Sequence, residues 1–508
     1  MKIKSIPIFL FTLCLVTVVF YNCGPGKSTQ NNTADPIPLQ QTQLPQDVIN
    51  TCSVDSVTFA SWFSGGKVTE NGHVFAPSSL SFNPQNNCSF YAWSEQMFLW
   101  LTSDTLNGTT LESPVFYTVT PSSNGERQLI PHGQGSKIKA FVNIAKIETE
   151  EGQANADNVL LDRNGNLVYY ITMVNDVYAA MLYMAAQSPQ SVTRFPTTQQ
   201  QINSIDSFAK LNSISISNPN LLAMELKTSW VKLEGTMNKN DYITIDAIIP
   251  KYDKKSASEW ILTGDTFATL ALVGMHIVGS ANGHPEMIWS TFEHRSNTPN
   301  SSYQYIDTTG KTVTVAPDST GQWLFNQNAQ NTNIAEANQS YASFSGNEIT
   351  AATDSIQPSN TIRVLPWGSA YDVQPNQQDS SPAAANSEVI AINNSVLNKL
   401  VGNDVRKNYI FIGSTWTMNG AVPNGNVYNP TVSGSTAPGA AIGTSSLANS
   451  TMETDFQLTP TANINGQPAT NTCFTCHGNT LDPKTPFGLS HIFSDLLNGV
   501  QQNKQPKK

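Results

Sequence analysis

Five residues near the C-terminus, Cys473-Phe474-Thr475-Cys476-His477, constrain this chain more than any other stretch. A C-x-x-C-H run is the signature of covalent haem attachment, in which the two thiols bind the porphyrin and the adjoining imidazole ligates the iron. Two intervening residues let both sulfurs reach one edge of the ring. The sequence therefore predicts one covalent haem c, with Cys473 and Cys476 as its anchors and His477 as an axial iron ligand.

Two other uses of paired cysteines fit this run less well. A zinc site needs further Cys or His ligands, and the sequence contains no second C-x-x-C. A thioredoxin-type redox pair does not require the histidine. Haem attachment uses all three residues.

The place of the motif in the chain limits what can complete the iron coordination. Residues 478–508 follow it and contain no Met, whereas an ordinary small cytochrome c takes its second axial ligand from well downstream. The sixth ligand is therefore expected to come from upstream, to come from His491, or to be absent. Met452 is the leading candidate, and a thioether packed against the porphyrin is its other interpretation. The remaining candidates lie in the body of the chain: His276, His284, His294, Met275 and Met287.

Length and charge exclude some classes of protein. A chain of 508 residues can bury a large core in one domain or more. Charged residues make up only 13%, the net charge is −10, and Lys and Arg are not gathered in one stretch. No nucleic-acid partner is expected.

Residues 1–23 are expected to be an export leader. Lys2 and Lys4 precede an apolar run, 6–20, that suits a signal peptide and is short for a membrane span. Cys23 follows as in a lipoprotein signal, although Phe20-Tyr21-Asn22 stand where small residues are usual, so lipidation, an uncleaved anchor and a plain signal peptide all stay open. We expect a protein outside the cytoplasm, in the periplasm or at the outer membrane or cell surface, held to the membrane by an N-terminal lipid or leader.

Two cysteines remain once the leader and the haem motif are set aside. Cys52 and Cys88 are expected to form a disulfide, because an exported chain folds in an oxidising compartment. Two buried thiols are the alternative, since the sequence does not show whether their Cβ atoms lie within bonding range.

The body shows both helical and strand periodicity, which predicts an α+β fold with a β-rich main body. Helices are expected at 91–101, 177–187 and 198–210 and after a cap at Ser387; strands at 167–172, 228–233, 242–249 and 409–417; and a long hairpin at 269–278 and 287–294. The predicted domains are a disordered tether at 24–48, the main body at 49–420, a Gly/Pro/Ser/Thr-rich linker at 421–448, and a small helical haem-binding segment at 449–508 with an apolar stripe from Leu489 to Val500.

The predicted hairpin carries several groups that suit haem chemistry. His276 and His294 fall on its strands and His284 in its loop, and Glu293 and Arg295 flank His294. His276, Glu293, His294 and Arg295 are therefore candidates for lining an open distal site. A histidine on a half-buried strand is more often a hydrogen-bonded core residue.

Four segments together resemble a group of large bacterial exported proteins with one c-type haem motif near the C-terminus, which belong to the cytochrome c family. These segments are Ser94-Glu95-Gln96-Met97, 274–278, 288–294 and 451–454, the last ahead of Cys473 to His477. The resemblance implies haem attachment and a body that forms one unit with the haem segment. It implies no catalytic residue.

Three functions are consistent with the sequence. The leading hypothesis is an exported, membrane-anchored monohaem cytochrome that passes electrons to a redox partner protein or a small-molecule acceptor. The first alternative is a peroxidase- or oxygenase-like haem enzyme with an open distal site. The second is a surface binding module with an appended haem segment. The sixth ligand separates the first two, because an empty site permits small-molecule chemistry and a Met ligand raises the potential. The sequence does not determine the oligomeric state.

Overall fold

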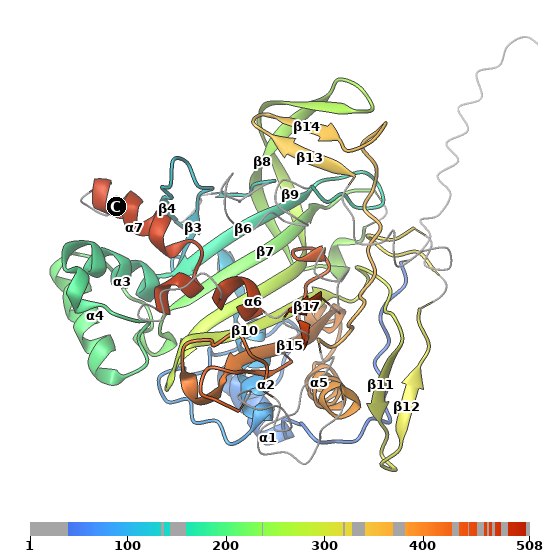
Figure 1. Ribbon diagram of the computed structural model, residues 1–508, viewed down its shortest axis with the longest axis horizontal. Helices are drawn as coiled ribbons and strands as arrows, with labels where there is room; N and C mark the ends of the chain where they lie inside the picture. The colour runs from blue at the N-terminus through green and yellow to red at the C-terminus, as the bar shows by residue number, and fades with distance from the viewer. Residues whose placement is uncertain are drawn as a thin grey trace, which may run out of the picture. The chain divides into compact units, whose positions relative to one another are not determined.

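The computed structural model shows an α+β fold built around one large, mostly antiparallel sheet (Figure 1). The predicted β-rich fold class is thereby confirmed. All described residues belong to one compact unit, Pro38–Lys508. They are residues 39–133, 137–142, 159–235, 237–318, 321–327, 341–368, 382–428, 436–444, 447–454, 462–464, 467–469, 473–478 and 486–503.

The main row of the sheet runs β16-β15-β10-β9-β7-β6-β3-β4 with antiparallel neighbours throughout. In chain order its strands are β3 (Phe116–Val119), β4 (Leu129–Pro131), β6 (Val168–Asn175), β7 (Met224–Lys232), β9 (Glu259–Ala281), β10 (His284–His294), β15 (Tyr409–Thr417) and β16 (Ala441–Gly443). The first half of β9 also pairs with β8 (Thr244–Lys254) and with β14 (Glu348–Ala351). On their other sides, β8 pairs with β5 (Ile138–Lys139) and β14 pairs with β13 (Ala342–Ser345). Smaller sheets form from β1 (Asp104–Thr105) with β2 (Gly108–Thr109), β11 (Tyr303–Ile306) with β12 (Thr312–Val315), and β17 (Ala462–Ile464) with β18 (Gln467–Ala469).

The hairpin of β9 and β10 is the longest element, and it confirms the predicted hairpin while extending both of its strands. Its turn contains Gly283 at φ +80°, a conformation that glycine adopts without steric cost. Pairing on both sides, with β7 and β15, places the hairpin in the middle of the sheet. Its β-branched and aromatic residues suit that position.

The described helices are α1 (Ser56–Trp62), α2 (Asn87–Leu101), α3 (Asp176–Gln187), α4 (Gln199–Leu211), α5 (Pro382–Leu397), α6 (Cys473–Gly478) and α7 (Phe493–Asn503). α2, α3 and α4 match the predicted helices, and Thr198 caps α4 in a reciprocal box with Gln201. Two boundaries differ from prediction. α5 begins before Ser387, whose hydroxyl bonds to the Ala383 carbonyl inside the helix. α7 begins only at Phe493, after a 3-10 turn.

The two faces of the sheet have different covers. Successive residues of a strand point to opposite faces. On one face the ring of Phe292 stacks on Phe98 of α2, with centroids 4.3 Å apart. On the other face Trp289 shares a hydrophobic cluster with side chains of α3, α7 and Phe474 of α6. The aromatic stripe of α2 is thus core, and the C-terminal segment occupies the opposite face.

Two segments that the sequence assigns to connections are built into the fold. The described end of the predicted tether, 39–48, lies against the body: Gln40 donates to the Gln322 carbonyl and Val48 forms a β-bridge with Asp307. The predicted linker contributes β16, which pairs with β15. The leader, the first part of the tether and Cys23 lie outside the described residues. Among the residues that are described, no helix has both the length and the apolar character that a membrane crossing requires.

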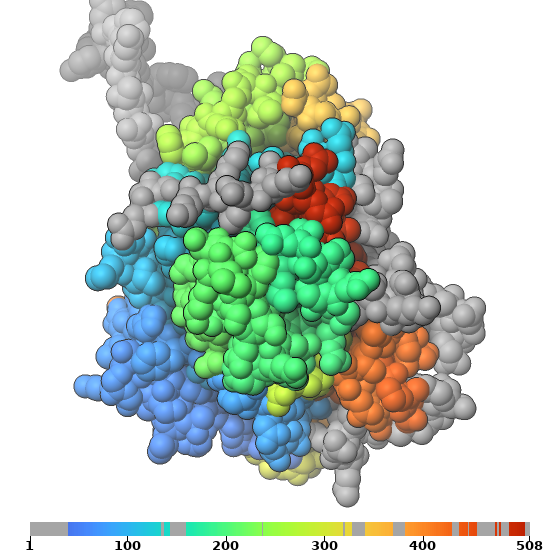
Figure 2. Space-filling model, turned by 90° about the vertical axis from the view of Figure 1, so that its left-hand side faces the viewer, coloured from blue at the N-terminus to red at the C-terminus, as the bar shows by residue number. Residues whose placement is uncertain are grey.

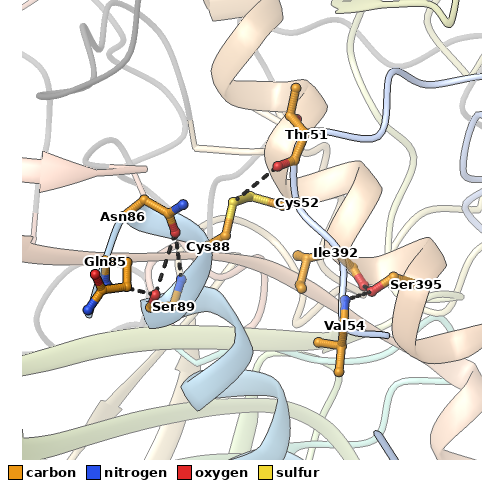
Figure 3. Close-up of a disulfide and its surroundings, with 9 residues drawn as sticks. All are labelled: Thr51, Cys52, Val54, Gln85, Asn86, Cys88, Ser89, Ile392 and Ser395. Carbon is orange, nitrogen blue, oxygen red and sulfur yellow. Dashed lines mark hydrogen bonds between the residues drawn. A yellow bond between two sulfur atoms is a disulfide. The ribbon is translucent and has the colours of Figure 1, made fainter. Parts of the chain in front are cut away.

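Cys52 and Cys88 form the disulfide that the sequence predicts, with Cα atoms 5.3 Å apart (Figure 3). Cys88 lies in the first turn of α2, and Cys52 precedes α1. The backbone N–H of Val54 donates to the Ser395 hydroxyl of α5 nearby. The disulfide thus joins the segment before α1 to α2, and the hydrogen bond of Val54 joins the same segment to α5. The disulfide is consistent with a protein that folds outside the reducing cytoplasm.

Candidate functional site

The C-x-x-C-H run forms a short helix against the sheet. Cys473 and Cys476 occupy positions one helical turn apart on α6. Phe474 is buried, and its ring lies 5.9 Å from the ring of Trp289, centroid to centroid. This contact places α6 beside β10 (Figure 1).

The imidazole of His477 lies among two rings and a backbone carbonyl. Its Nδ1 is 2.8 Å from the Leu489 carbonyl oxygen, and its ring centroid is 3.8 Å from that of His491 and 4.4 Å from that of Trp289. Burial is the main cause that lowers the pKa of His477 to about 4, so the ring is neutral at pH 7. A carbonyl only accepts, so Nδ1 carries the proton and the lone pair belongs to Nε2. Histidines that ligate metals commonly hold their other nitrogen in this way.

Three polar side chains, His276, Lys227 and Glu453, meet on the same face of the sheet, and we call them the His276 cluster. His276 of β9 pairs directly with Lys227 of β7. Both carboxylate oxygens of Glu453 lie 2.8 Å from Nε2 of His276, and Lys227 Nζ lies 3.7 Å from one of them. Burial raises the pKa of Glu453, but interactions with His276 and Lys227 outweigh burial and lower it to about 2.

The His276 cluster lies beside His477. All three members of the cluster act electrostatically on the imidazole of His477. Thr291 pairs directly with His276, so Trp289 is a diagonal neighbour of His276, and such neighbours lie about 7–8 Å apart. Trp289 is also the ring that contacts His477. The structure thus brings together two histidines that are far apart in the sequence.

A loop at residues 449–454, which we call the covering loop, carries Glu453 to this face. The backbone N–H of Ser450 donates to Glu293 at 2.8 Å. Gly274 permits the close approach of the loop, because a Cβ at that position would lie 2.6 Å from the Thr451 hydroxyl oxygen. The position of the covering loop on β9 therefore depends on the absence of a side chain at residue 274.

Met452, the leading sequence candidate for the sixth ligand, points into the protein interior. Its side chain is 1% exposed and belongs to a hydrophobic cluster with Tyr170, Val231 and Val273. Phe474 of α6 belongs to a different cluster. These contacts favour a packing role among protein side chains.

His294 and Arg295 are held by structural contacts. His294 donates from Nε2 to the Asp241 carbonyl at 3.0 Å and accepts at Nδ1 from the Ser296 N–H at 3.2 Å. Burial lowers the pKa of His294 to about 3. Arg295 donates to the Thr42 carbonyl. Both ring nitrogens of His294 are therefore already engaged.

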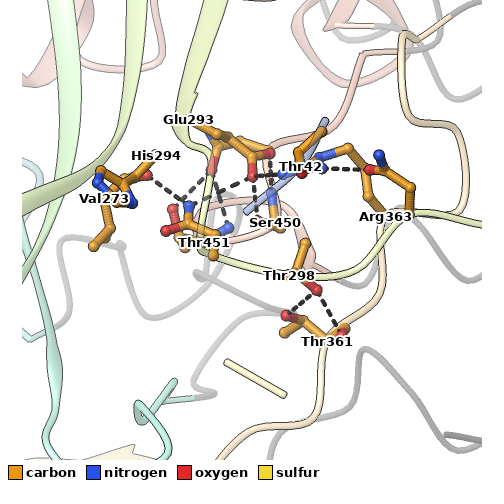
Figure 4. Close-up of polar contacts among 12 residues, drawn as sticks. Thr42, Val273, Glu293, His294, Thr298, Thr361, Arg363, Ser450 and Thr451 are labelled. Atoms are coloured by element: carbon orange, nitrogen blue, oxygen red, sulfur yellow. Dashed lines mark hydrogen bonds and ion pairs between the residues drawn. The ribbon is translucent and has the colours of Figure 1, made fainter. Parts of the chain in front are cut away.

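Glu293 of β10 forms a buried ion pair with Arg363 and also accepts hydrogen bonds from Ser450 of the covering loop (Figure 4). Its carboxylate accepts from Arg363 at 2.7 Å, and both side chains have no exposed area. Arg363 also donates to Asn300. An ion pair so enclosed has a structural role, because exposing or breaking it is costly. Of the four candidates for a distal site, only His276 lies beside His477.

The remaining ligand candidates are spread over the fold. His284 lies at the hairpin turn, where Nδ1 contacts Glu286 at 2.8 Å. Met275 belongs to the core on the α2 side of the sheet. Met287 belongs to the same cluster as Trp289 and Phe474.

Polar contacts attach α7 and the turn before it to the body. Ser490 donates to Glu225 at 2.6 Å and shares a hydrogen bond with the Tyr178 hydroxyl. Arg127 and Asp495 form a buried ion pair, with Arg127 Nε 3.6 Å from one carboxylate oxygen of Asp495. Burial raises the pKa of Glu225 to about 7. The C-terminal segment is therefore integrated with the body, and Figure 2 shows that it also reaches the surface beside α3 and α4.

Sequence reasoning did not single out Lys227 or Glu225. The strand was expected to begin at Thr228, whereas β7 begins at Met224 and includes both charged residues. Glu225 and Lys227 alternate with apolar residues, and this alternation indicates a strand that carries both charged side chains on one face. Glu453 lies within one of the resembling segments, and no local pattern in the sequence indicates its partner on β9, His276.

No model of a known protein family matches this chain, and no curated protein or solved structure matches it either.

Proposed function

We propose that this chain is an exported c-type cytochrome that carries one covalent haem c on α6 and transfers electrons to a redox partner protein or a small-molecule acceptor. The observation that carries the proposal is the state of His477 within the C-x-x-C-H run: a neutral ring whose Nδ1–H is donated to the Leu489 carbonyl. This tautomer is the one that presents Nε2 to iron.

The residue types on α6 are those that attachment of haem c requires. Cys473 and Cys476 would anchor the porphyrin, and His477 would ligate the iron. Haem c supplies a one-electron redox couple when bound. The rings of Trp289 and Phe474 lie beside α6 and would provide apolar walls that limit access of water to a bound haem, which is one of the means by which a protein tunes a haem.

Three segments that resemble exported monohaem cytochromes converge on this site. Residues 274–278 supply His276, residues 288–294 supply Trp289, and residues 451–454 supply Glu453. The convergence supports membership of the cytochrome c family. Residues 274–278 and 288–294 meet as the paired strands β9 and β10, and the covering loop adds the third segment. The convergence also supports a body that completes the haem site.

The surface position of the C-terminal segment suits exchange of electrons with a partner. Figure 2 shows part of this segment at the surface. Asn498 of α7 is exposed to solvent. The compartment we propose is the periplasm or the outer membrane, with a lipid on Cys23 as the anchor. The Cys52–Cys88 disulfide supports an oxidising compartment of this kind.

The proposal is tested by producing the full chain with a c-type haem maturation system. Haem should stay with the polypeptide through acid extraction and denaturing electrophoresis, and the visible spectrum should change reversibly on one-electron reduction. Cys473→Ala/Cys476→Ala should lose the covalent haem, while Thr475→Ala, within the same motif, should keep it. Wild-type chain that matures without covalent haem, or Cys476→Ala with full covalent attachment, would rule the proposal out.

A haem enzyme is the second candidate, and the His276–Glu453 pair favours it. A histidine held by a carboxylate can accept and return a proton beside a metal. This function requires an open coordination position, so ferric protein should be high-spin and should react rapidly with peroxide. A low-spin ferric protein that does not react with peroxide would exclude it.

A further inference from the structure

We propose that His276 is the second axial ligand of the haem iron, opposite His477, and that Glu453 holds it in place. The inference rests on the proposed function, because it requires haem on α6. It makes the site a bis-histidine centre built from two distant parts of the chain.

The first argument is position. His276, Lys227 and Trp289 share one face of the sheet, and Trp289 packs on His477. The side chain of His276 is 18% exposed, so it is partly buried and still has some access to solvent. It is the histidine of β9 and β10 that the structure places beside His477.

The second argument is the partner of His276. Metal-bound histidines usually donate their other ring nitrogen to a carboxylate or carbonyl, which orients the ring and raises its basicity. Glu453 does this to Nε2 with both oxygens at 2.8 Å. Among the described residues no hydrogen bond reaches Nδ1 of His276, and imidazole binds iron through either nitrogen. Leu489 gives His477 the equivalent support.

The third argument excludes His491. Its ring stacks on His477 with planes 12° apart. The plane of a ligand imidazole contains the bond to the iron, so a ring stacked face to face lies beside that bond. His491 therefore occupies the same side of the haem as His477 and cannot face it across the iron in this arrangement.

The other candidates are placed less well. Both nitrogens of His294 are engaged, and Met275 faces α2 on the opposite side of the sheet. Met452 is enclosed in its own cluster. Met287, which shares a cluster with Trp289, is the competitor that an experiment must separate from His276.

The consequence would be an iron with no open coordination position. Two histidine ligands leave no position for peroxide or oxygen and hold the potential below that of a His/Met centre. The site is then specialised for electron transfer, and Glu453 tunes it through the basicity of His276.

Electron paramagnetic resonance and visible spectra of the ferric full-length protein test the inference. The wild type should be six-coordinate and low-spin. His276→Ala should lose the low-spin signal, become high-spin and bind cyanide, and added imidazole should restore the low-spin form. His284→Ala is the matched control, because His284 lies on the same hairpin and is also paired with a carboxylate; its spectrum should stay that of the wild type, as should that of Met287→Leu.

Covalent haem, scored by electrophoresis, separates this inference from the proposed function. A high-spin wild type with covalent haem, an unchanged His276→Ala spectrum, or loss of the low-spin signal in Met287→Leu would each overturn the ligand assignment alone. If His276→Ala folds poorly, His276→Gln retains an amide for Glu453 and should still lose the low-spin signal. Glu453→Gln should keep the low-spin form and raise the reduction potential, since a weaker acceptor leaves His276 less basic.

Discussion

At the scale of single residues, Asp176 shows how burial couples folding to pH. This carboxyl is 1% exposed in the first turn of α3, and it accepts the Ser217 N–H at 2.6 Å. Burial is the largest cause that raises its pKa from 3.8 to about 6. Because the folded pKa exceeds the unfolded one, its stabilising contribution is complete below about pH 4 and is lost as pH rises through about 6.

Asp176→Asn should therefore gain stability relative to the wild type between about pH 4 and about pH 7.5, on the order of 2–3 kcal/mol at about 1.4 kcal/mol per pKa unit. Urea unfolding of both proteins at the two pH values measures the difference. Asp206→Asn on the surface of α4 is the control and should change by less than about 0.5 kcal/mol. Equal curves for Asp176→Asn and the wild type at both pH values would contradict the assignment.

At the scale of elements, the disulfide ties the segment before α1 to the start of α2 across a separation of 36 residues. Closing such a loop restricts the unfolded chain, so Cys52→Ala/Cys88→Ala should lower the free energy of unfolding by about 2–4 kcal/mol. Guanidinium unfolding of the wild type and the double variant measures this difference in the free energy of unfolding. Wild type treated with reductant should shift by a similar amount, and the double variant should not respond to reductant. A variant as stable as the wild type would show that other contacts already restrain this segment.

At the scale of the whole molecule, the C-terminal segment is part of the core. Removing residues 449–508 would uncover Trp289 and leave Glu293 without Ser450 and Glu225 without Ser490. We expect the truncated chain to lose cooperative unfolding, as followed by tryptophan fluorescence and circular dichroism. Ser490→Ala is the graded comparison and should cost about 1–2 kcal/mol. A truncated chain with the wild-type unfolding midpoint would mean that the segment is an independent appendage.

Prediction from the sequence succeeded where the signal is local. The hairpin at β9 and β10, the helices α2 to α4 and the apolar stripe before Val500 each follow from a periodicity within a few turns of chain. It was less accurate where tertiary contacts override local composition. The polar residues 39–48 and the Gly-rich residues before Gly443 read as connections, yet the body supplies them with partners. Glu225 and Lys227 also suggest that the strand begins after them, yet both lie within β7, where tertiary contacts with Ser490 and Glu453 accommodate their charges.

The sequence by itself determined the chemistry that is possible at His477, because the spacing of two cysteines and a histidine needs no tertiary context. It also predicted the Cys52–Cys88 disulfide, and the structure decided between that bond and two buried thiols by placing the Cα atoms 5.3 Å apart. Which side chains lie beside His477 was decided by the tertiary structure. His276 and Glu453 are 177 residues apart, and only the register of the sheet and the close passage of the covering loop over Gly274 bring them together. Such pairings depend on long-range packing, which no local pattern in the chain encodes.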